Sequence, residues 1–227
     1  MHLWDWMNTC FSVETIAFTI VGYNMSWIEL FGTALNLWSV WLVAKRKILT
    51  WPVSIIAVLL FMSLFYQIRL YSDAIEQIYY LLTSIYGWWL WTSPAGSREL
   101  GVKFTFSSGR LIIFCILLTG VLSIGFGAGM SRVHIWFPHL FPAPADFPFL
   151  DALTTMMSFT ANMLMAFGRI ECWIYWITVD VIAVGLYSAK DVKLIAALYF
   201  IFLIIAMNGL MTWNKVRTRR QRQTEFA

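Results

Sequence analysis

A stripe of polar and aromatic side chains follows the segment YSDAIEQIYYLLTSIYGWWLW, residues 71–91. In a helix that turns by about 100° per residue, Gln77, Tyr80, Ser84 and Trp88 share one face, and the neighbouring face is apolar. Hydrocarbon offers a glutamine no hydrogen-bond partner, so exposure of Gln77 to lipid would be costly. We therefore expect this stripe, on which Gly87 and Trp91 also fall, to point into the protein.

A second stripe lies in ECWIYWITVDVIAVGLY, residues 171–187, where Trp173, Trp176 and Asp180 fall close together on a helical face. An ionisable residue within a membrane span is a candidate for function, although Asp180 could also bridge helices by hydrogen bonds alone. Tryptophans can instead form an interfacial belt, an interpretation that suits Trp88 and partly Trp173 but suits Trp176 poorly. Asn208, in a later apolar segment, adds another amide.

Together these candidate residues predict the chemistry of a ligand. Aromatic faces stack on planar rings and attract cationic ones, while amides bind carboxamides or hydroxyl groups. No cluster of Arg or Lys accompanies them, which disfavours phosphate esters. The predicted ligand is an unphosphorylated polar metabolite that contains a ring.

The elements that carry these residues are predicted membrane spans. Of the 227 residues, 60% are hydrophobic and 12% are charged, a composition typical of an integral membrane protein. Residues 1–25 are expected to form a periplasmic segment, with an interfacial helix over 1–24, and 131–149 a loop because it contains four prolines. Seven spans of adequate length are predicted near 27–44, 51–70, 73–91, 110–130, 150–168, 172–189 and 192–213.

The basic residues predict the orientation of the chain. With the N-terminus outside, twelve of the sixteen Lys and Arg residues fall on the cytoplasmic side, as the positive-inside rule requires. The formal charge of +4 therefore reflects topology, and no nucleic-acid partner is expected. Residues 214–227 are predicted to be a basic cytoplasmic tail that contacts anionic lipid.

An internal duplication is indicated by residues 122 positions apart. This offset pairs Glu29 with Asp151, Thr33 with Thr155, Asn36 with Ser158, Lys47 with Arg169 and Trp51 with Trp173. Small polar residues at these positions could also simply bond neighbouring helices. The predicted fold is all-α, with three-helix repeats at 26–92 and 150–213 joined by the span 110–130. This parallel 3+1+3 arrangement, known from the SWEET transporters, usually encloses a substrate site.

The sequence also resembles the PnuC family of bacterial nicotinamide riboside transporters from about residue 26 onward. The similarity rests on the 71–91 segment, on FYQIRLY, on the Trp-x-x-Trp pattern formed by Trp173 and Trp176, and on the ending ALYF…MNGLMTW. The resemblance implies a SWEET-like transporter of the inner membrane that takes up nicotinamide riboside by facilitated diffusion. A cytoplasmic riboside kinase would make uptake one-way, and a homo-oligomer such as a trimer is implied.

By the same resemblance, Trp173 and Trp176 belong to a selectivity motif, and Gln77, Tyr80 and Asn208 are candidate polar contacts. Two other cargoes, thiamine and riboflavin, are carried by related transporters, and a proton-coupled symporter using Glu29, Asp151 or Asp180 is a further alternative. No cofactor is expected. The histidines lack metal-ligand spacing and no catalytic motif is present, so the sequence does not predict an enzyme.

Overall fold

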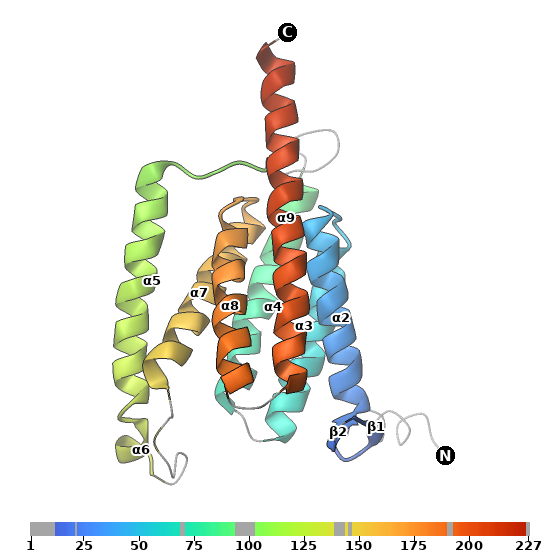
Figure 1. Ribbon diagram of the computed structural model, residues 1–227, viewed down its shortest axis with the longest axis vertical. Helices are drawn as coiled ribbons and strands as arrows, with labels where there is room; N and C mark the ends of the chain where they lie inside the picture. Colours follow the sequence, from blue (N-terminus) through green and yellow to red (C-terminus); the bar gives the residue numbers. More distant parts are fainter. Residues whose placement is uncertain are drawn as a thin grey trace. The chain divides into compact units, whose positions relative to one another are not determined.

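Long helices make up most of the chain. The computed structural model describes residues 12–20, 22–68, 71–93, 103–138, 144, 147–189 and 193–225. Seven helices of 18 residues or more, together with the short α6 (Val133–Trp136), lie within these ranges (Figure 1). The long ones are α2 (Trp27–Ala44), α3 (Thr50–Gln67), α4 (Tyr71–Thr92), α5 (Gly109–Met130), α7 (Pro148–Ala166), α8 (Cys172–Ala189) and α9 (Lys193–Glu225).

The predicted spans agree with the observed helices to within a few residues, except at the C-terminus, where α9 continues to Glu225 instead of ending near residue 213. Among the described residues, four helical stretches are long and apolar enough to cross a membrane: α2, α3, α5 and Ile195–Arg219 of α9. The apolar stretch of α8, Cys172–Ser188, is shorter. The chain is therefore a multi-pass helical membrane protein.

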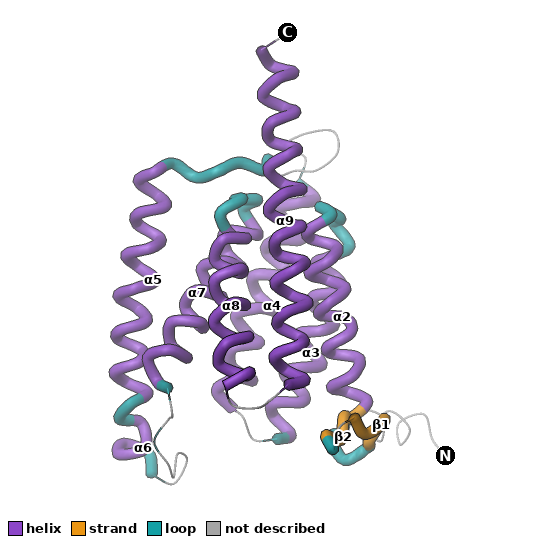
Figure 2. Tube along the Cα trace, viewed as in Figure 1, coloured by secondary structure: helices purple, strands orange, loops and turns teal. Residues whose placement is uncertain are grey.

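The chain divides into two compact units, residues 1–103 and 104–227. In unit 1, α2 packs on α3 and α3 packs on α4. In unit 2, α5 packs on α7, α7 on α8 and α8 on α9 (Figure 2). The hydroxyl groups of Thr119 and Thr160, 2.8 Å apart, join α5 to α7. The helix predicted to link two repeats is thus a packed member of unit 2.

The N-terminal segment differs from the predicted interfacial helix. Residues 1–11 lie outside the described residues, and the part that follows forms an antiparallel hairpin of β1 (Ile16–Ile20) and β2 (Tyr23–Ser26). Gly22, with a φ of 81°, lies in the tight connection, a conformation that favours glycine. A helix over residues 1–24 is therefore wrong for the described part, because a glycine turn that follows β-branched residues and precedes a tyrosine favours a hairpin.

The hairpin is fastened to the start of α2 by side chains. Ser26 caps α2 by accepting a hydrogen bond from the Glu29 N–H at 3.3 Å. The Tyr23 hydroxyl donates a hydrogen bond of 2.5 Å to the Glu29 carboxylate. Partial burial and this hydrogen bond raise the pKa of Tyr23 to about 12, so the phenol remains a donor at neutral pH.

The predicted loop 131–149 contains α6 and the first two residues of α7, which begins at Pro148 as expected for a proline in a first helical turn. Residues 139–143, 145 and 146 of this loop lie outside the described residues.

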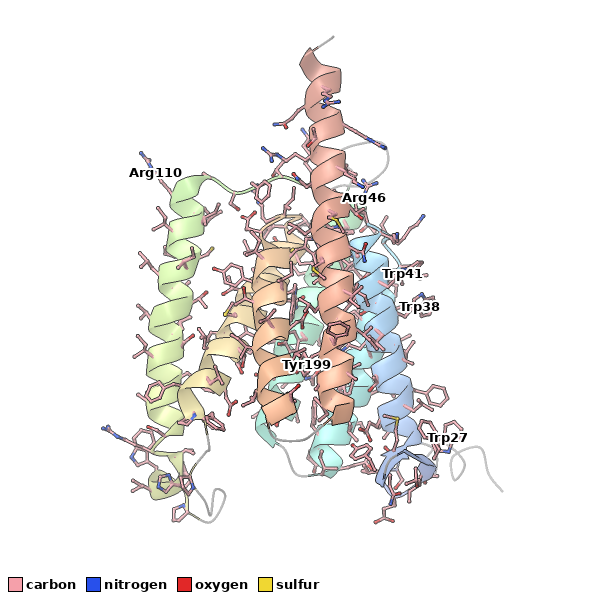
Figure 3. The ribbon with its side chains drawn as sticks, viewed as in Figure 1. Trp27, Trp38, Trp41, Arg46, Arg110 and Tyr199 are labelled. Atoms are coloured by element: carbon pink, nitrogen blue, oxygen red, sulfur yellow. The ribbon has the colours of Figure 1, made fainter. Side chains whose placement is uncertain are left out.

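Three exposed tryptophans mark the outer side of α2. Trp27, Trp38 and Trp41 are 38%, 46% and 48% exposed and project from the helix (Figure 3). Trp27 and Trp41 are separated by about 21 Å along the axis at 1.5 Å per residue. Trp27 is the first residue of α2 and Trp41 lies in its last turn, so aromatic rings occur at both ends of this candidate span, as in the interfacial belts of membrane proteins.

The turns that follow α2 and α7 have the same backbone geometry 122 residues apart. Arg46 and Gly168, at equivalent positions, have left-handed φ angles of 58° and 67°. The Lys47 N–H donates to Leu42 O at 2.9 Å, and the Arg169 N–H donates to Leu164 O at 2.8 Å. The similarity that the sequence showed at Lys47 and Arg169 therefore extends to the backbone.

The turn of unit 2 has an additional covering segment. Residues 104–108 lie alongside it, where the Ile170 N–H donates a hydrogen bond of 3.1 Å to Thr105 O. The buried Glu171 carboxylate accepts the Ser107 N–H at 3.1 Å, and the Arg217 guanidinium lies 5.0 Å from the centre of the Phe106 ring. These contacts attach the start of α5 to its own unit.

We predict that Gly168→Ala lowers the stability of the protein by about 1 kcal/mol, because a Cβ is unfavourable at a φ of 67°. Thermal unfolding in detergent would measure the change. Gly120→Ala, in the middle of α5 with open space around the added Cβ, is the matched control and should be neutral or stabilising. Equal effects of the two substitutions would contradict the importance of the turn conformation.

Candidate functional site

The stripe on α4 is buried at Gln77, Ser84, Gly87 and Trp91, but Tyr80 is only half-buried and Trp88 is exposed. Ile78, Leu82, Ile85 and Trp89, on the apolar face, are 47–62% exposed, whereas Gln77 and Ser84 are only 8% and 2% exposed. The expectation that Gln77 turns away from lipid is confirmed. Polar groups and lipid-facing groups therefore occupy separate sides of α4.

The buried polar groups of the stripe differ in their partners: Ser84 meets α3, whereas Gln77 bonds its own helix. The Ser84 and Ser54 hydroxyl groups lie 3.2 Å apart and join α4 to α3, and Gln77 donates from Nε2 to Asp73 O at 3.4 Å. Tyr80 is half-buried, and Trp88 is 41% exposed. Of the candidates on α4, Tyr80 and Trp88 are thus the most exposed, and Ser84 is the least exposed.

Gly87 and Trp91 of the same stripe belong to the packing of unit 1. A Cβ at Gly87 would lie 2.5 Å from Cζ3 of Trp51, so the indole of this α3 residue rests directly on the backbone of α4. Trp91 is fully buried and meets the Trp51 ring edge-to-face, with centroids 5.3 Å apart. These two residues hold helices together and leave no aromatic face for a ligand.

The two tryptophans of the Trp-x-x-Trp pattern have different surroundings. Trp173 is fully buried, presses on Gly209 and meets Trp213 edge-to-face at 5.4 Å. Trp176, one turn further along α8, is half-buried. Its indole N–H is covered, and no hydrogen-bond partner for it lies among the described residues. Trp176 is accordingly the better placed of the two for stacking on a ligand.

Asp180 is the buried carboxylate of α8. It is 4% exposed, and no hydrogen bond joins its side chain to another residue in the described part of the chain. The residue 122 positions earlier is Val58, which is also buried in its unit. A hydrogen-bonded bridge between helices therefore has no support at Asp180, and its oxygens are available as acceptors.

Asn208 lies on the exposed side of α9, where its Nδ2 donates to Ile204 O at 3.0 Å. Elsewhere on the same pair of helices, the rings of Tyr187 and Tyr199 stack at 5.6 Å with an angle of 9° between their planes. The candidate residues of unit 2 thus occupy α8 and α9, which pack on each other.

The sequence analysis placed Gly87 and Trp91 on the stripe of α4 without predicting their packing contact, and it missed Gly209 and Trp213. Gly87 and Gly209 are separated by 122 residues, and so are Trp91 and Trp213. Comparing all residues at this offset would have revealed both pairs. The pattern would also have indicated that Trp173, like Trp51, is a packing residue.

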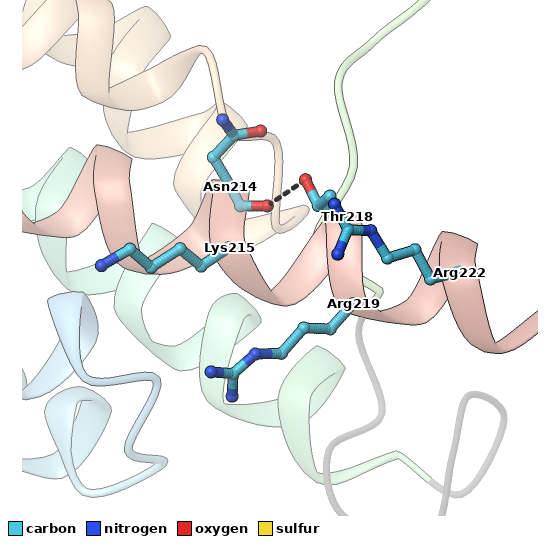
Figure 4. A pocket seen from close by; sticks show the side chains of 5 residues that line it. All are labelled: Asn214, Lys215, Thr218, Arg219 and Arg222. Atoms are coloured by element: carbon cyan, nitrogen blue, oxygen red, sulfur yellow. Dashed lines mark hydrogen bonds between the residues drawn. The ribbon is translucent and has the colours of Figure 1, made fainter.

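Two surface hollows lie apart from these residues. One, of about 240 Å³, follows the basic face of the α9 tail and is lined by Asn214, Lys215, Thr218, Arg219 and Arg222 (Figure 4). The other, of about 480 Å³, is apolar and lies against α3 and α4, between Leu59 and Ile78. None of the eight candidate residues lines either hollow.

Similarity to characterised proteins extends over most of the chain. The nicotinamide riboside transporter PnuC of Escherichia coli (strain K12) is 29% identical over 234 residues, covering 93% of this chain and 97% of its own. The riboflavin/roseoflavin transporter RibM of Streptomyces davaonensis is 25% identical, covering 95% and 94%. A crystal structure of the vitamin B3 transporter PnuC superposes with a TM-score of 0.62 at 22% identity, covering 85% of this chain and 83% of that one.

The sequence model of the family described as nicotinamide mononucleotide transporter matches residues 26–215, a range that includes α2 to α8 and most of α9. The chain therefore belongs to this family of membrane transporters.

Proposed function

We propose that the protein takes up nicotinamide riboside across the bacterial inner membrane by facilitated diffusion. Phosphorylation by a cytoplasmic riboside kinase traps the product and makes uptake one-way. The observation that carries this proposal is the pair Trp176 and Asp180 on α8, an incompletely covered indole one turn from a buried acceptor. The riboside offers a cationic ring for stacking, and its carboxamide and hydroxyl groups are donors for the carboxylate.

The riboside suits these residues better than its phosphorylated form. Neither the 77–91 stripe nor the 173–187 stripe contains Lys or Arg. A phosphate would need such a group, or the start of a helix, to offset its desolvation. Nicotinamide riboside is also the compound named for the E. coli relative.

Riboflavin is the second candidate ligand, favoured by the similarity to RibM. Its ring system would also stack on Trp176, and its ribityl hydroxyl groups would also meet Asp180. Thiamine, which related transporters carry, is a further alternative ligand. The alternative mechanism is proton-coupled symport, which would use Glu29, Asp151 or Asp180.

The proposed architecture is a parallel 3+1+3 repeat of SWEET type, with the N-terminus outside and the C-terminus in the cytoplasm. The matching turns after α2 and α7 support the repeat. The basic face of the α9 tail supports the orientation, because Lys215, Arg219 and Arg222 would meet the anionic lipid of the cytoplasmic leaflet. We also propose a homo-oligomer, such as a trimer.

Quenching of the intrinsic tryptophan fluorescence tests the ligand. Purified protein in detergent would be titrated with nicotinamide riboside, nicotinamide mononucleotide, riboflavin and thiamine. Saturable quenching by the riboside at the lowest concentration supports the proposal. Tighter binding of the mononucleotide, riboflavin or thiamine would replace the proposed substrate by that compound.

Uptake into liposomes tests the mechanism. Liposomes that contain the protein but no kinase should equilibrate radiolabelled riboside without concentrating it. Accumulation that depends on a proton gradient would instead establish a symporter.

We predict that Gln77→Ala and Asn208→Ala each weaken riboside binding by roughly 1–3 kcal/mol, the cost of leaving a polar group of the ligand unmatched. Trp176→Ala should weaken binding more, because stacking is lost as well. Fluorescence titration measures the affinity of each variant, with calorimetry for the variant that lacks a tryptophan. Ile85→Ala, on the exposed apolar face of α4, is the control and should bind normally. Normal affinity in Gln77→Ala and Asn208→Ala would exclude both as ligand contacts.

Asp180→Val is predicted to keep the protein folded with an unchanged or higher melting temperature, since Val58 fills the equivalent position of unit 1. Its affinity for the riboside should fall by roughly 1–3 kcal/mol, because the acceptor is gone. Asp180→Asn keeps an acceptor oxygen and should retain more of the affinity. A clear loss of thermal stability in Asp180→Val, with normal binding, would show that the carboxylate is structural.

A further inference from the structure

In the described part of each unit, a tryptophan ring packs directly against the backbone of a glycine, a contact that the proposed function does not use. In unit 1, Trp51 at the start of α3 presses on Gly87 of α4. In unit 2, Trp173 at the start of α8 presses on Gly209 of α9. A second tryptophan, Trp91 or Trp213, closes each contact edge-to-face at 5.3 or 5.4 Å.

The closeness of each contact fixes how the two helices lie against each other. A Cβ at Gly209 would come within 2.5 Å of Cζ2 of Trp173, and the same distance separates a Cβ at Gly87 from Cζ3 of Trp51. Ordinary carbon contacts are about 3.5–4.0 Å long, so any side chain would push ring and helix apart by about 1 Å. Glycine is therefore required for the observed spacing.

The contact of unit 2 lies beside candidate ligand residues on both helices that it joins, and the contact of unit 1 lies beside candidate ligand residues on α4. In unit 2, Trp176 follows Trp173 by one turn of α8, and Asn208 precedes Gly209 on α9. In unit 1, Ser54 follows Trp51 by one turn of α3, while Ser84 and Trp88 flank Gly87 on α4. The Ser54–Ser84 hydroxyl contact of 3.2 Å spans the same pair of helices.

We propose that Trp173 and Gly209, and equally Trp51 and Gly87, are positioning residues for substrate recognition. Each tryptophan acts as a spacer that sets the register and separation of two helices, and so the positions of the ligand contacts on α4 in unit 1 and on α8 and α9 in unit 2. The inference rests on the proposed function for its ligand, although the packing contact itself does not. A displacement of about 1 Å is enough to disturb a preorganised binding site.

The indole N–H groups provide a way to test this without destroying the fold. Nε1 of Trp51 and Nε1 of Trp173 are buried, and neither has a hydrogen-bond partner within the described ranges. Phenylalanine removes this unpaired donor and shortens the ring. A smaller ring also leaves room for a methyl group, so Trp→Phe should compensate for Gly→Ala on the facing helix.

The experiment is a double-mutant cycle with Trp173→Phe and Gly209→Ala, repeated in unit 1 with Trp51→Phe and Gly87→Ala. Thermal unfolding without ligand and the dissociation constant for nicotinamide riboside, measured well below unfolding by calorimetry, are the two readouts. Gly185→Ala on α8, where an added Cβ meets no atom within 4 Å, is the control for substituting a helical glycine.

We expect Gly209→Ala to lower the melting temperature by on the order of 5 °C and to weaken riboside binding about tenfold or more. The double variant should recover most of both losses. Gly185→Ala should keep wild-type affinity. If Gly209→Ala fails to fold and the double variant folds, the recovery of folding already demonstrates the contact.

Two results would overturn the inference. Additive stability effects in the cycle would mean that the ring and the glycine do not interlock. Wild-type affinity in both Gly209→Ala and Trp173→Phe would mean that the contact is structural only. If neither the single nor the double variant that carries Gly209→Ala folds, the affinity of Trp173→Phe alone decides this point. Failure of the wild-type protein to bind the riboside would contradict the proposed function, while the ligand-free stability cycle would still test the interlock.

Discussion

The close contact between an indole ring and a glycine backbone is the constraint on which the packing of both units depends. A bilayer provides little hydrophobic driving force between helices, so tight van der Waals packing at small residues has to supply it. Trp51 on Gly87 and Trp173 on Gly209 provide such packing at the first turn of α3 and of α8. The left-handed turns at Arg46 and Gly168 bring the chain into position five residues before each tryptophan.

Helix positions and helix faces could be predicted from the sequence because the surrounding hydrocarbon determines which residues can be exposed. Hydrocarbon excludes unpaired polar groups, so periodicity along α4 separated the buried Gln77 and Ser84 from the exposed Leu82 and Trp89. The prolines of 131–149 likewise excluded a long helix there. Each of these inferences needs only one helix and its surroundings.

The residues against which each side chain packs could not be predicted in the same way. Periodicity placed Trp91 and Trp173 on polar stripes, yet both are fully buried, because an aromatic ring packs wherever the facing helix supplies a small residue. The hairpin of β1 and β2 was missed because aromatic and apolar content suggested an interfacial helix, whereas the turn at Gly22 decided the local structure. The first error concerns information that lies on another helix, whereas the second overlooked a glycine turn within the segment itself.

Comparison of residues 122 positions apart separates the residues that make the same packing contact in both units from those that differ between the units. Trp51 and Trp173, Gly87 and Gly209, and Trp91 and Trp213 keep their types at the 122-residue offset, and each pair makes the same contact. Other buried positions differ: Ser54 corresponds to Trp176, and Val58 to Asp180. A ligand such as nicotinamide riboside has no two-fold symmetry, so its recognition requires side chains that differ between similar helical scaffolds. The positions where the two units disagree are therefore where specificity can reside.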